Sequence, residues 1–125
     1  TVFKHERKNF IVINIHLSPH ALNMRRRKQL GIAIEALQLL KYVNMPSLIV
    51  GDYNYSSLIF RGGLIRFMAK HGFATGHKKK LITHRKWRIH PQTDYVFSRN
   101  CKIQSIKSER IKLSDHYPMF VKFEV

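Results

Sequence analysis

The amino-acid sequence predicts one α+β or α/β domain in which helices pack against β-sheet. Strand-like segments, either alternating or continuously apolar, interleave with segments whose apolar residues recur every three or four positions, as on helices. A chain of 125 residues has the length of one compact domain rather than two. Its hydrophobic content of 44% is enough to build a core. No repeat, low-complexity tract or linker divides the chain, so residues 1–125 are expected to form a single domain.

The N-terminal part is expected to form two strands and a long helix. Val2 and Phe3 begin the first strand, and a charged turn leads to residues 10–17, whose nearly continuous apolar character is typical of a doubly covered central strand. Asn23 is the expected helix cap, and Pro46 closes the segment. The apolar residues at the spacing of one helix face are Leu30, Ala33, Ile34, Leu37 and Leu40.

The middle of the chain alternates strand and helix again. Residues 47–50 read as a short buried strand, and the polar residues 51–54 follow at its carboxyl end, where α/β proteins bind ligands. Leu64, Phe67 and Met68 predict a second helix that Gly72 ends. A basic loop then covers residues 77–80, and residues 81–83 are expected to form a strand.

Two further strands are expected near the C-terminus. The first spans residues 93–98, which carry three consecutive large apolar side chains. The second covers residues 119–125, where apolar residues alternate with others as in a strand with two different faces.

The chain is strongly basic, with 23 Lys and Arg against 7 Asp and Glu, which gives a net charge of +16. Such an excess attracts polyanions by releasing their counterions. Nucleic acid is the first expected partner and an anionic membrane surface the second. A basic surface that serves only solubility or a ribonucleoprotein role remains the alternative.

The single cysteine, Cys101, excludes an internal disulfide and a site with several thiolates. A reducing compartment is therefore expected, either the cytoplasm or the nucleoid or nucleus. The longest apolar stretches are far shorter than the ~20 residues that cross a bilayer. The first residues resemble no secretory signal and lack an initiator Met, which suggests a processed or trimmed end.

Three of the seven acidic residues lie beside Asn or His in short polar segments at predicted strand ends: Asp52, Asp94 and Asp115. Carboxylate and amide oxygens bind hard cations such as Mg²⁺, and phosphoryl transfer needs a base and positive charge. Each segment also has an ordinary explanation as a turn, a cap or a strand end. His16, at the end of an apolar strand, could equally be a hydrogen-bonded core residue.

Taken in order, four motifs resemble the successive signatures of the endonuclease/exonuclease/phosphatase family. They are residues 14–17 (Asn-Ile-His-Leu), 46–54 (ending Gly-Asp-Tyr-Asn), 93–98 (beginning Thr-Asp-Tyr) and 114–118 (Ser-Asp-His-Tyr-Pro). The family includes DNase I-like nucleases, abasic-site endonucleases, inositol polyphosphate phosphatases and sphingomyelinases. The resemblance implies a DNase I-like αββα sandwich and metal-dependent phosphodiester hydrolysis, with DNA or RNA as the first expected substrate.

The resemblance also implies a role for each matching residue. His116 would be the general base, or the partner of the transition-state phosphate, and Asp94 would fix its tautomer. Asp115 would be a ligand of Mg²⁺ or Mn²⁺. Asp52 would orient the attacking water or protonate the leaving oxygen. The two remaining matches would face the phosphate, Asn54 as a donor to its oxygen and His16 as a second imidazole.

A basic cluster around Trp87 is a further candidate for substrate binding. Its members are Lys78, Lys79, Lys80, Arg85, Lys86 and Arg88. Cations interleaved with an aromatic ring suit a nucleic-acid backbone and a stacked base, and a solvated loop around a buried Trp is the alternative. The histidines outside the motifs, His84 included, are expected on the surface, and His84 and Arg85 are possible phosphate contacts. The cations of residues 25–28 open the long helix where its dipole disfavours them, which suggests a binding use.

The sequence departs from the family pattern in its first part. The early Asn and the metal-binding Glu that normally precede the His-Leu strand are absent, because Glu6 lies in a charged turn and Glu35 on a helix. The chain therefore resembles the C-terminal half of the fold and lacks much of the N-terminal half. A bare inner sheet face would then be expected to pair with a second copy or with the missing segment. Two other functions stay open: an inactive nucleic-acid-binding remnant, and a phosphatase-like or sphingomyelinase-like phosphodiesterase.

Overall fold

The structure is a computed structural model of the chain, and it describes residues 1–55, 58–76, 80–85, 91–111 and 114–125. The elements are β1 (Val2–His5), β2 (Lys8–His16), α1 (Asn23–Leu39), β3 (Ser47–Asp52), α2 (Leu58–Lys70), β4 (Ala74–Thr75), β5 (Asp94–Arg99), β6 (Lys102–Ser108) and β7 (Met119–Glu124). No helix in these ranges is both long and apolar enough to cross a membrane.

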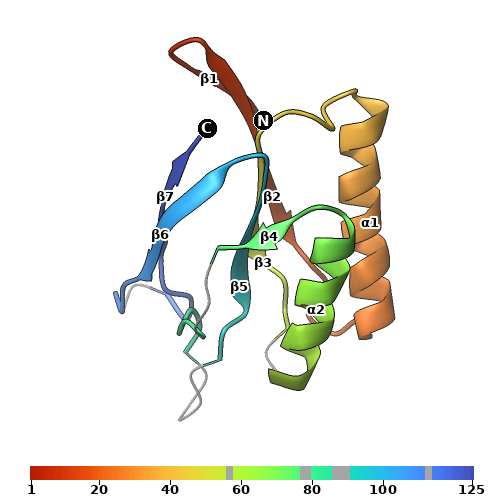
Figure 1. The fold of residues 1–125 in the computed structure, drawn as a ribbon. Coiled ribbons are helices and arrows are strands. Elements are labelled where there is room, and N and C mark those ends of the chain that lie inside the picture. Colours follow the sequence, from red (N-terminus) through yellow and green to blue (C-terminus); the bar gives the residue numbers. More distant parts are fainter. Residues whose placement is uncertain (56–57, 77–79, 86–90, 112–113) are drawn as a thin grey trace.

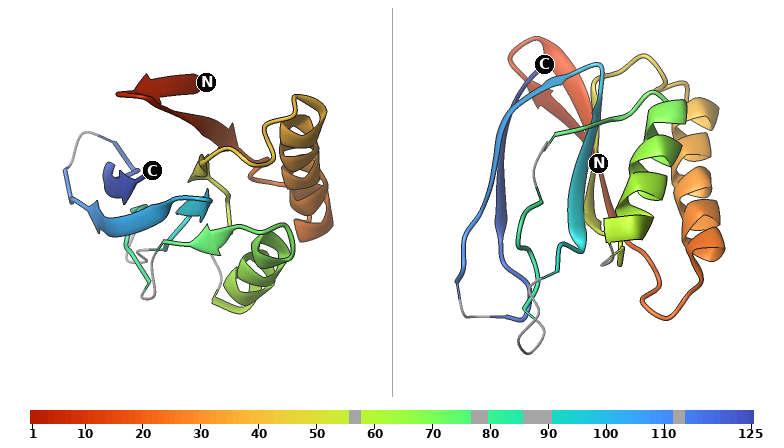
Figure 2. Two further views of the ribbon diagram at one scale, coloured as in Figure 1. Left: turned by 45° about the horizontal axis from the view of Figure 1, so that its top comes forward. Right: turned by 60° about the horizontal axis from the view of Figure 1, so that its bottom comes forward.

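The molecule has three layers (Figure 1). The middle layer is a five-stranded sheet with the order β1-β2-β3-β5-β4, in which β2 and β3 are parallel and the other neighbours antiparallel. Helices α1 and α2 cover one face of this sheet, and the antiparallel pair β6-β7 lies on the other, as the two views in Figure 2 show. The α+β prediction is confirmed.

The main core lies between the helices and the five-stranded sheet. Leu30, Ile34 and Leu37 form the buried side of α1 and pack in one cluster with Ile11 and Ile49 of the sheet. Three tyrosines, Tyr53, Tyr55 and Tyr95, are also fully buried there. Their hydroxyls donate to the carbonyls of Ile49, Asn23 and Tyr55, respectively, so large apolar rings enter the core without leaving a polar group unpaired.

A second contact joins the two sheets. Phe10 of β2 packs edge-on against Phe123 of β7 with ring centroids 5.3 Å apart, and it stacks on Phe3 at the same distance. Along β7 the residues alternate between partly buried and exposed, which confirms the two-faced strand expected there. The inner face of the five-stranded sheet is not bare, because β6-β7 lies across it (Figure 2).

Several expected element boundaries were wrong. Asn23 does not cap α1: Leu22 occupies the N-cap position without a side-chain hydrogen bond, and Asn23 is the first helical residue. Leu40 lies just beyond the helix and is 60% exposed. Residues 81–83 form no strand, because their backbone meets Pro91 and Tyr117 through single hydrogen bonds, and only His84 bridges to His116.

Two strands, β4 and β6, were not predicted, and the expected environment of a third, β2, was wrong. Strand β4 has only two residues, and β6 carries a register shift between Ile103 and Ser105 that breaks its alternation. Strand β2 is the second strand of the sheet rather than a doubly covered central one, and its burial is mixed. Strand β3, which lies between β2 and β5, begins with three consecutive buried residues.

One of the cations at the start of α1 has a structural use. The guanidinium of Arg26 donates to the carbonyls of Ser18 and Pro19 and to the side chain of Asn23. It also lies over the Tyr55 ring, 5.6 Å from the centroid. Arg26 therefore ties the loop that follows β2 to the first turn of the helix.

Candidate active site

Strand register places three predicted site residues side by side at one edge of the five-stranded sheet. His16 at the end of β2 pairs with Asp52 at the end of β3, and Asp52 pairs with Asp94 at the start of β5. Because β2 and β3 are parallel and β5 is antiparallel to β3, these positions meet at the same rim. The rim is the carboxyl end of the two parallel strands, where open α/β sheets bind ligands.

His116 reaches this rim from the loop that leads into β7. A short backbone ladder holds the loop: Tyr117 N–H donates to the Thr83 carbonyl at 2.8 Å, and Arg85 N–H donates to the Asp115 carbonyl at 2.6 Å. The imidazole Nδ1 of His116 lies 3.0 Å from Oδ2 of Asp94. Its Nε2 lies 3.8 Å from Oδ2 of Asp52, so one imidazole links two carboxylates.

Asp52 is the centre of the cluster. Its Oδ2 lies 3.7 Å from Nε2 of His16 and 3.8 Å from Nε2 of His116, so two imidazoles flank one carboxylate. Burial raises the pKa of Asp52 above its ordinary value, against the lowering effect of a hydrogen bond from Asn54 N–H, and the nearby charge of Asp94 adds to the rise. His16 is much more open, with 72% of its side chain exposed.

The residues beside Asp52 fix its orientation. Asn54 adopts a left-handed φ of 55°, and its backbone N–H donates to Oδ1 of Asp52 at 2.8 Å. The Asn54 side-chain amide donates to Oδ2 of Asp52 at 3.1 Å and to the Leu17 carbonyl at 2.8 Å. Both amide hydrogens are thus engaged within the protein, so Asn54 positions Asp52 here, and its donation to a phosphate stays a prediction.

Asp94 is held from the other side by two threonines. The buried Thr83 accepts hydrogen bonds from the backbone N–H groups of Thr93 and Asp94 through its Oγ1, at 3.0 and 3.1 Å. The Thr93 hydroxyl donates to Oδ2 of Asp94 at 2.9 Å, the same oxygen that faces His116. The Asp94 carboxylate can therefore accept a hydrogen bond from Nδ1–H of His116, which favours the neutral tautomer whose Nε2 is unprotonated.

Asp115 lies at the side of this cluster and is highly exposed. The Ser114 hydroxyl donates to its Oδ1 at 3.1 Å and holds the pKa of Asp115 below its ordinary value. The other oxygen, Oδ2, lies 3.5 Å from Nε2 of His84. Asp115 therefore faces outward beside an imidazole.

His84 is the site residue that the sequence placed wrongly, since it was grouped with the surface histidines. Only 16% of its side chain is exposed, and its ring meets the ring of His116 at a centroid distance of 4.5 Å. The pairing of His84 with His116 joins segments 32 residues apart, which no local pattern reveals. The one available signal for its burial was its position just after Leu81, Ile82 and Thr83, the segment expected to form a strand.

The predicted substrate-binding residues are less closely tied to the cluster. Arg85 is exposed and touches the site through its backbone bond to Asp115. Trp87 lies outside the described residues, as do Lys78, Lys79, Lys86 and Arg88 of the predicted basic cluster. The structure thus brings together His16, Asp52, Asp94 and His116, with Asn54 and Asp115 beside them.

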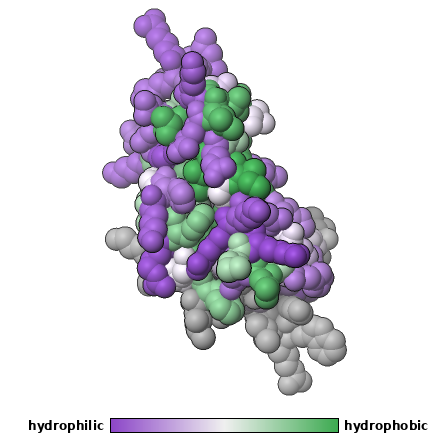
Figure 3. Space-filling model, turned by 90° about the vertical axis from the view of Figure 1, so that its right-hand side faces the viewer, coloured by the Kyte–Doolittle hydropathy of each residue, from purple (hydrophilic) through white to green (hydrophobic). Residues whose placement is uncertain are grey.

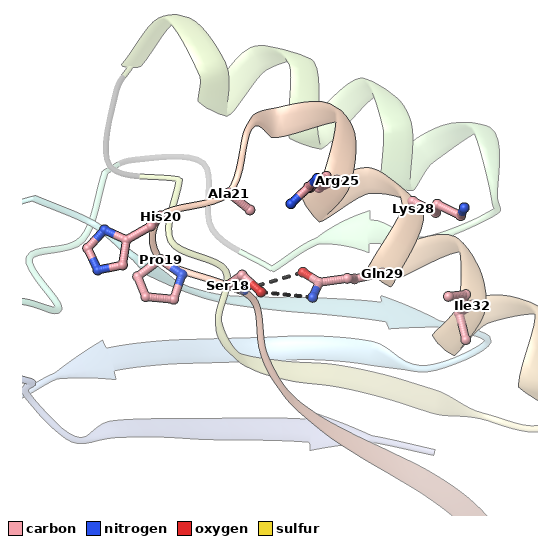
Figure 4. A pocket seen from close by; sticks show the side chains of 8 residues that line it. All are labelled: Ser18, Pro19, His20, Ala21, Arg25, Lys28, Gln29 and Ile32. Atoms are coloured by element: carbon pink, nitrogen blue, oxygen red, sulfur yellow. Dashed lines mark hydrogen bonds between the residues drawn. The ribbon is translucent and has the colours of Figure 1, made fainter.

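A basic pocket of about 540 Å³ lies next to the end of β2 (Figure 4). Gln29 of α1 donates from Nε2 to Oγ of Ser18, which closes one side of it. Arg25 and Lys28 of α1 contribute the cationic lining, and His20 of the loop also lines the pocket. Ser18, which lines the pocket, is two residues after His16 in the chain.

The donor atoms at the rim fit Mg²⁺ poorly. Mg²⁺ prefers an octahedral shell of oxygens, but the one ligand cluster found among the described residues combines a carboxylate with two imidazoles, from Asp115, His84 and His116. None of the chain's four glutamates belongs to that cluster. The carboxylates of Asp52 and Asp94 are already bonded to neighbouring side chains.

Comparison with solved structures agrees with this architecture. The chain matches an endonuclease/exonuclease/phosphatase from Beutenbergia cavernae with a TM-score of 0.75 at 19% identity, covering 96% of this chain and 36% of that one. A mannosyl-6-phosphatase from Bacteroides thetaiotaomicron gives 0.69 at 15% identity, with 96% and 53% covered. TDP2 from D. rerio, complexed with a single-strand DNA product, gives 0.68 at 14% identity, with 99% and 60% covered.

The chain therefore has the fold of endonuclease/exonuclease/phosphatase proteins, as the sequence motifs implied. It spans about half of the length of several of these structures. No protein-family model matches the sequence, and no curated protein matches it either. The relationship is accordingly one of fold.

Proposed function

We propose that this chain supplies the general-base part of an active site that hydrolyses phosphodiesters. One observation carries the proposal: Nδ1 of His116 lies 3.0 Å from Asp94, while its Nε2 lies 3.8 Å from Oδ2 of Asp52, beyond ordinary hydrogen-bond distance. A histidine oriented by a carboxylate on one nitrogen and open on the other is the usual arrangement of a general base.

The chemistry follows from the positions of the four side chains. Nε2 of His116 accepts a proton from water, the water oxygen bonds to phosphorus, and the bond to the leaving oxygen breaks. Asp52 is suited to return a proton to that oxygen, because burial raises its pKa. His16, open to solvent beside Asp52, is placed to donate a hydrogen bond to the phosphate and so to offset the negative charge that develops on it.

A divalent cation, Mg²⁺ or Mn²⁺ in the family resemblance, would add positive charge at the phosphate. Asp115 is the side chain proposed to contact it, since its carboxylate is exposed beside the cluster. No step described above passes through this ion, because the donor set at the rim does not match a Mg²⁺ shell.

Nucleic acid is the proposed substrate. The net charge of +16 favours a polyanion, and cations line the pocket beside the end of β2. The fold neighbour from D. rerio was solved with a single-strand DNA product. The neighbour that is a mannosyl-6-phosphatase keeps a phosphatase as the alternative on the same fold.

A catalytically inactive nucleic-acid-binding unit is the second candidate. It is favoured by the poor fit to Mg²⁺ and by the absence of glutamate from the ligand cluster in the described part of the chain. Under this proposal the chain binds single-stranded DNA or RNA with the affinity its charge confers, and it cleaves neither in Mg²⁺ nor in Mn²⁺.

The proposed functional unit is one partial domain, residues 1–125, completed by a second copy of the chain or by an N-terminal segment that supplies the other half of the fold. Its support is the coverage of about half of each matched structure. Size-exclusion chromatography with light scattering tests the pairing of two copies. A species of twice the chain mass is expected, and a monomer at all concentrations would rule that pairing out.

Cleavage of fluorescent single-stranded DNA and RNA tests the hydrolytic proposal. His116→Ala is expected to lower the rate roughly 10²- to 10⁴-fold, the usual contribution of a general base. Asp94→Asn should also lower the cleavage rate, because it removes the carboxylate that fixes the tautomer of His116. His71→Ala is the matched control, since this exposed histidine packs on Phe67 at the end of α2.

The outcomes separate the two candidates. Cleavage that survives in His116→Ala would mean a contaminating nuclease or a wrongly assigned base. Tight binding without cleavage by the wild type in both metals would favour the inactive unit. Release of phosphate from phosphomonoesters, with intact DNA and RNA, would favour the phosphatase.

A further inference from the structure

The cluster of His84, Asp115 and His116 has the composition of a transition-metal site. One ligand atom from each residue lies within 4.8 Å of the other two. Two imidazoles and a carboxylate are typical ligands of zinc and related borderline ions, whereas hard cations such as Mg²⁺ take oxygens. This donor set is therefore chemically different from the one expected for Mg²⁺.

The spacing of one pair of ligand atoms, those of His84 and Asp115, points the same way. Nε2 of His84 and Oδ2 of Asp115 are 3.5 Å apart, longer than an ordinary N–H···O hydrogen bond. Two ligands of a tetrahedral zinc ion with bonds of about 2.0–2.2 Å are separated by about 3.3–3.6 Å. In an octahedral Mg²⁺ shell, with bonds of about 2.0–2.1 Å, the neighbouring ligands are separated by only about 2.9 Å.

The surroundings of the two imidazoles also suit a metal. Nδ1 of His116 faces Asp94 at 3.0 Å, and a metal-bound histidine typically donates its second nitrogen to a carboxylate. Nδ1 of His84 is buried and has no hydrogen-bond partner among the residues that the structure describes, so Nε2, which faces Asp115, is the nitrogen of this ring that can contact a metal. The backbone bridge between His84 and His116 holds the two rings together without any side-chain hydrogen bond between them.

We infer that His84, Asp115 and His116 bind one borderline transition-metal ion such as Zn²⁺ or Co²⁺, and that this ion inhibits hydrolysis. Because Nδ1 of His116 already faces Asp94 at 3.0 Å, Nε2 is the nitrogen left for the metal, and its lone pair is the one that the proposed general base needs. The inhibitory part of the inference rests on the proposed function. The binding part depends only on the three side chains, and it is measured without any reaction.

Metal binding is tested first on the metal-free protein. Equilibrium dialysis with Zn²⁺ and the visible absorption of Co²⁺ should show one tight equivalent in the wild type. His84→Ala and Asp115→Asn should each weaken binding roughly tenfold or more, as losses at metal sites typically do. His71→Ala controls for the remaining histidines and should bind as the wild type does. Circular dichroism checks that each variant is folded.

Equal affinity in wild type, His84→Ala and Asp115→Asn would overturn the inference, as would the absence of a stoichiometric equivalent in the wild type. If His84→Ala does not fold, Asp115→Asn decides, because that side chain is exposed. Inhibition is then measured by adding Zn²⁺ to a Mn²⁺-supported cleavage assay. Each protein is compared with its own activity without Zn²⁺, and Zn²⁺ should remove a larger fraction of the activity of wild type than of His84→Ala. If no cleavage occurs at all, only the proposed function fails, and the binding result still stands.

Discussion

Asp52 shows how one side chain at the rim combines opposing electrostatic influences. Burial and the charge of Asp94 disfavour its ionised form, whereas the N–H of Asn54 and the flanking imidazoles favour it. The raised pKa means that ionising Asp52 costs the folded protein stability. Such a loss of stability is expected at a residue with a catalytic role, because perturbed pKa values concentrate at functional sites.

Replacing Asp52 by Asn is expected to change the pH dependence of stability. Since the folded pKa of Asp52 lies above the unfolded value near 3.8, the wild type should lose stability relative to Asp52→Asn as pH rises through the folded pKa. Urea unfolding of both proteins at several pH values between acid and neutral measures the difference. Asp115→Asn is the control with the opposite sign, because the pKa of Asp115 is lowered. A pH-independent difference for Asp52→Asn would contradict the assignment.

Gly51 is the residue whose backbone makes the placement of Asp52 possible. Its φ of 132° is a conformation that side-chain-bearing residues rarely adopt, and an added Cβ would lie 2.0 Å from the Ile15 carbonyl oxygen. Gly51→Ala should therefore destabilise the fold by about 2–4 kcal/mol. Gly31→Ala, with nothing within 4 Å of its added Cβ, should instead stabilise helix α1 by about 0.5–1 kcal/mol. Denaturant unfolding distinguishes the two, and equal effects would refute this role of Gly51.

At the scale of elements, the site depends on an irregular segment rather than on a regular strand. Residues 80–85 form no strand, yet they contact the loop before β5 through Thr83 and the loop before β7 through His84. One short segment thus connects the loops that carry Asp94 and His116. The strand expected at residues 81–83 is replaced by these side-chain and single backbone bonds.

Thr83→Val tests the importance of that connection. The substitution keeps the shape but removes the oxygen that accepts the backbone N–H groups of Thr93 and Asp94. Two buried donors without acceptors should cost about 2–4 kcal/mol. Thr83→Ser retains the oxygen and should cost far less. Urea unfolding of both variants measures the difference, and a loss for Thr83→Ser as large as the loss for Thr83→Val would contradict a dominant role of the hydroxyl.

At the scale of the whole molecule, the side covered by the helices mixes hydrophilic and apolar side chains (Figure 3). The face covered by the helices carries apolar patches among its hydrophilic side chains (Figure 3), and Met24, Ile32 and Leu39 of α1 are among the exposed apolar residues. The cations of the pocket beside β2 come from the first part of α1. A polyanion is therefore expected to contact the N-terminal part of this helix rather than its whole length.

Salt dependence of binding tests this expectation. The affinity for single-stranded DNA should fall linearly with salt on a logarithmic scale. Arg25→Ala combined with Lys28→Ala should lower the slope by about one unit for each phosphate that these cations neutralise in the wild type. Lys4→Ala with Arg7→Ala, in and after β1 at the far end of β2 from His16, is the matched control. Equal slopes for the two double variants would show that Arg25 and Lys28 of the pocket do not contact the DNA phosphates.

The sequence by itself determined the elements with strong local patterns and the order of the four motifs. Strands β3, β5 and β7 and helix α2 were expected close to where they lie, because periodicity and helix-ending residues act over a few positions. Strand β6 was missed because Ile103 and Ile106 are three residues apart in the sequence, which breaks the alternation typical of a strand. The structure has a register shift between Ile103 and Ser105 at this point. The DNase I-like fold followed from the motifs and agrees with the solved structures.

Only the tertiary structure decided how these residues meet. Strand register aligned His16, Asp52 and Asp94, and a backbone bridge between distant segments brought His84 into contact with His116. The same structure showed that both amide hydrogens of Asn54 are occupied. Pairing between segments far apart in the chain depends on how the sheets and loops pack together, and no short stretch of sequence contains that information.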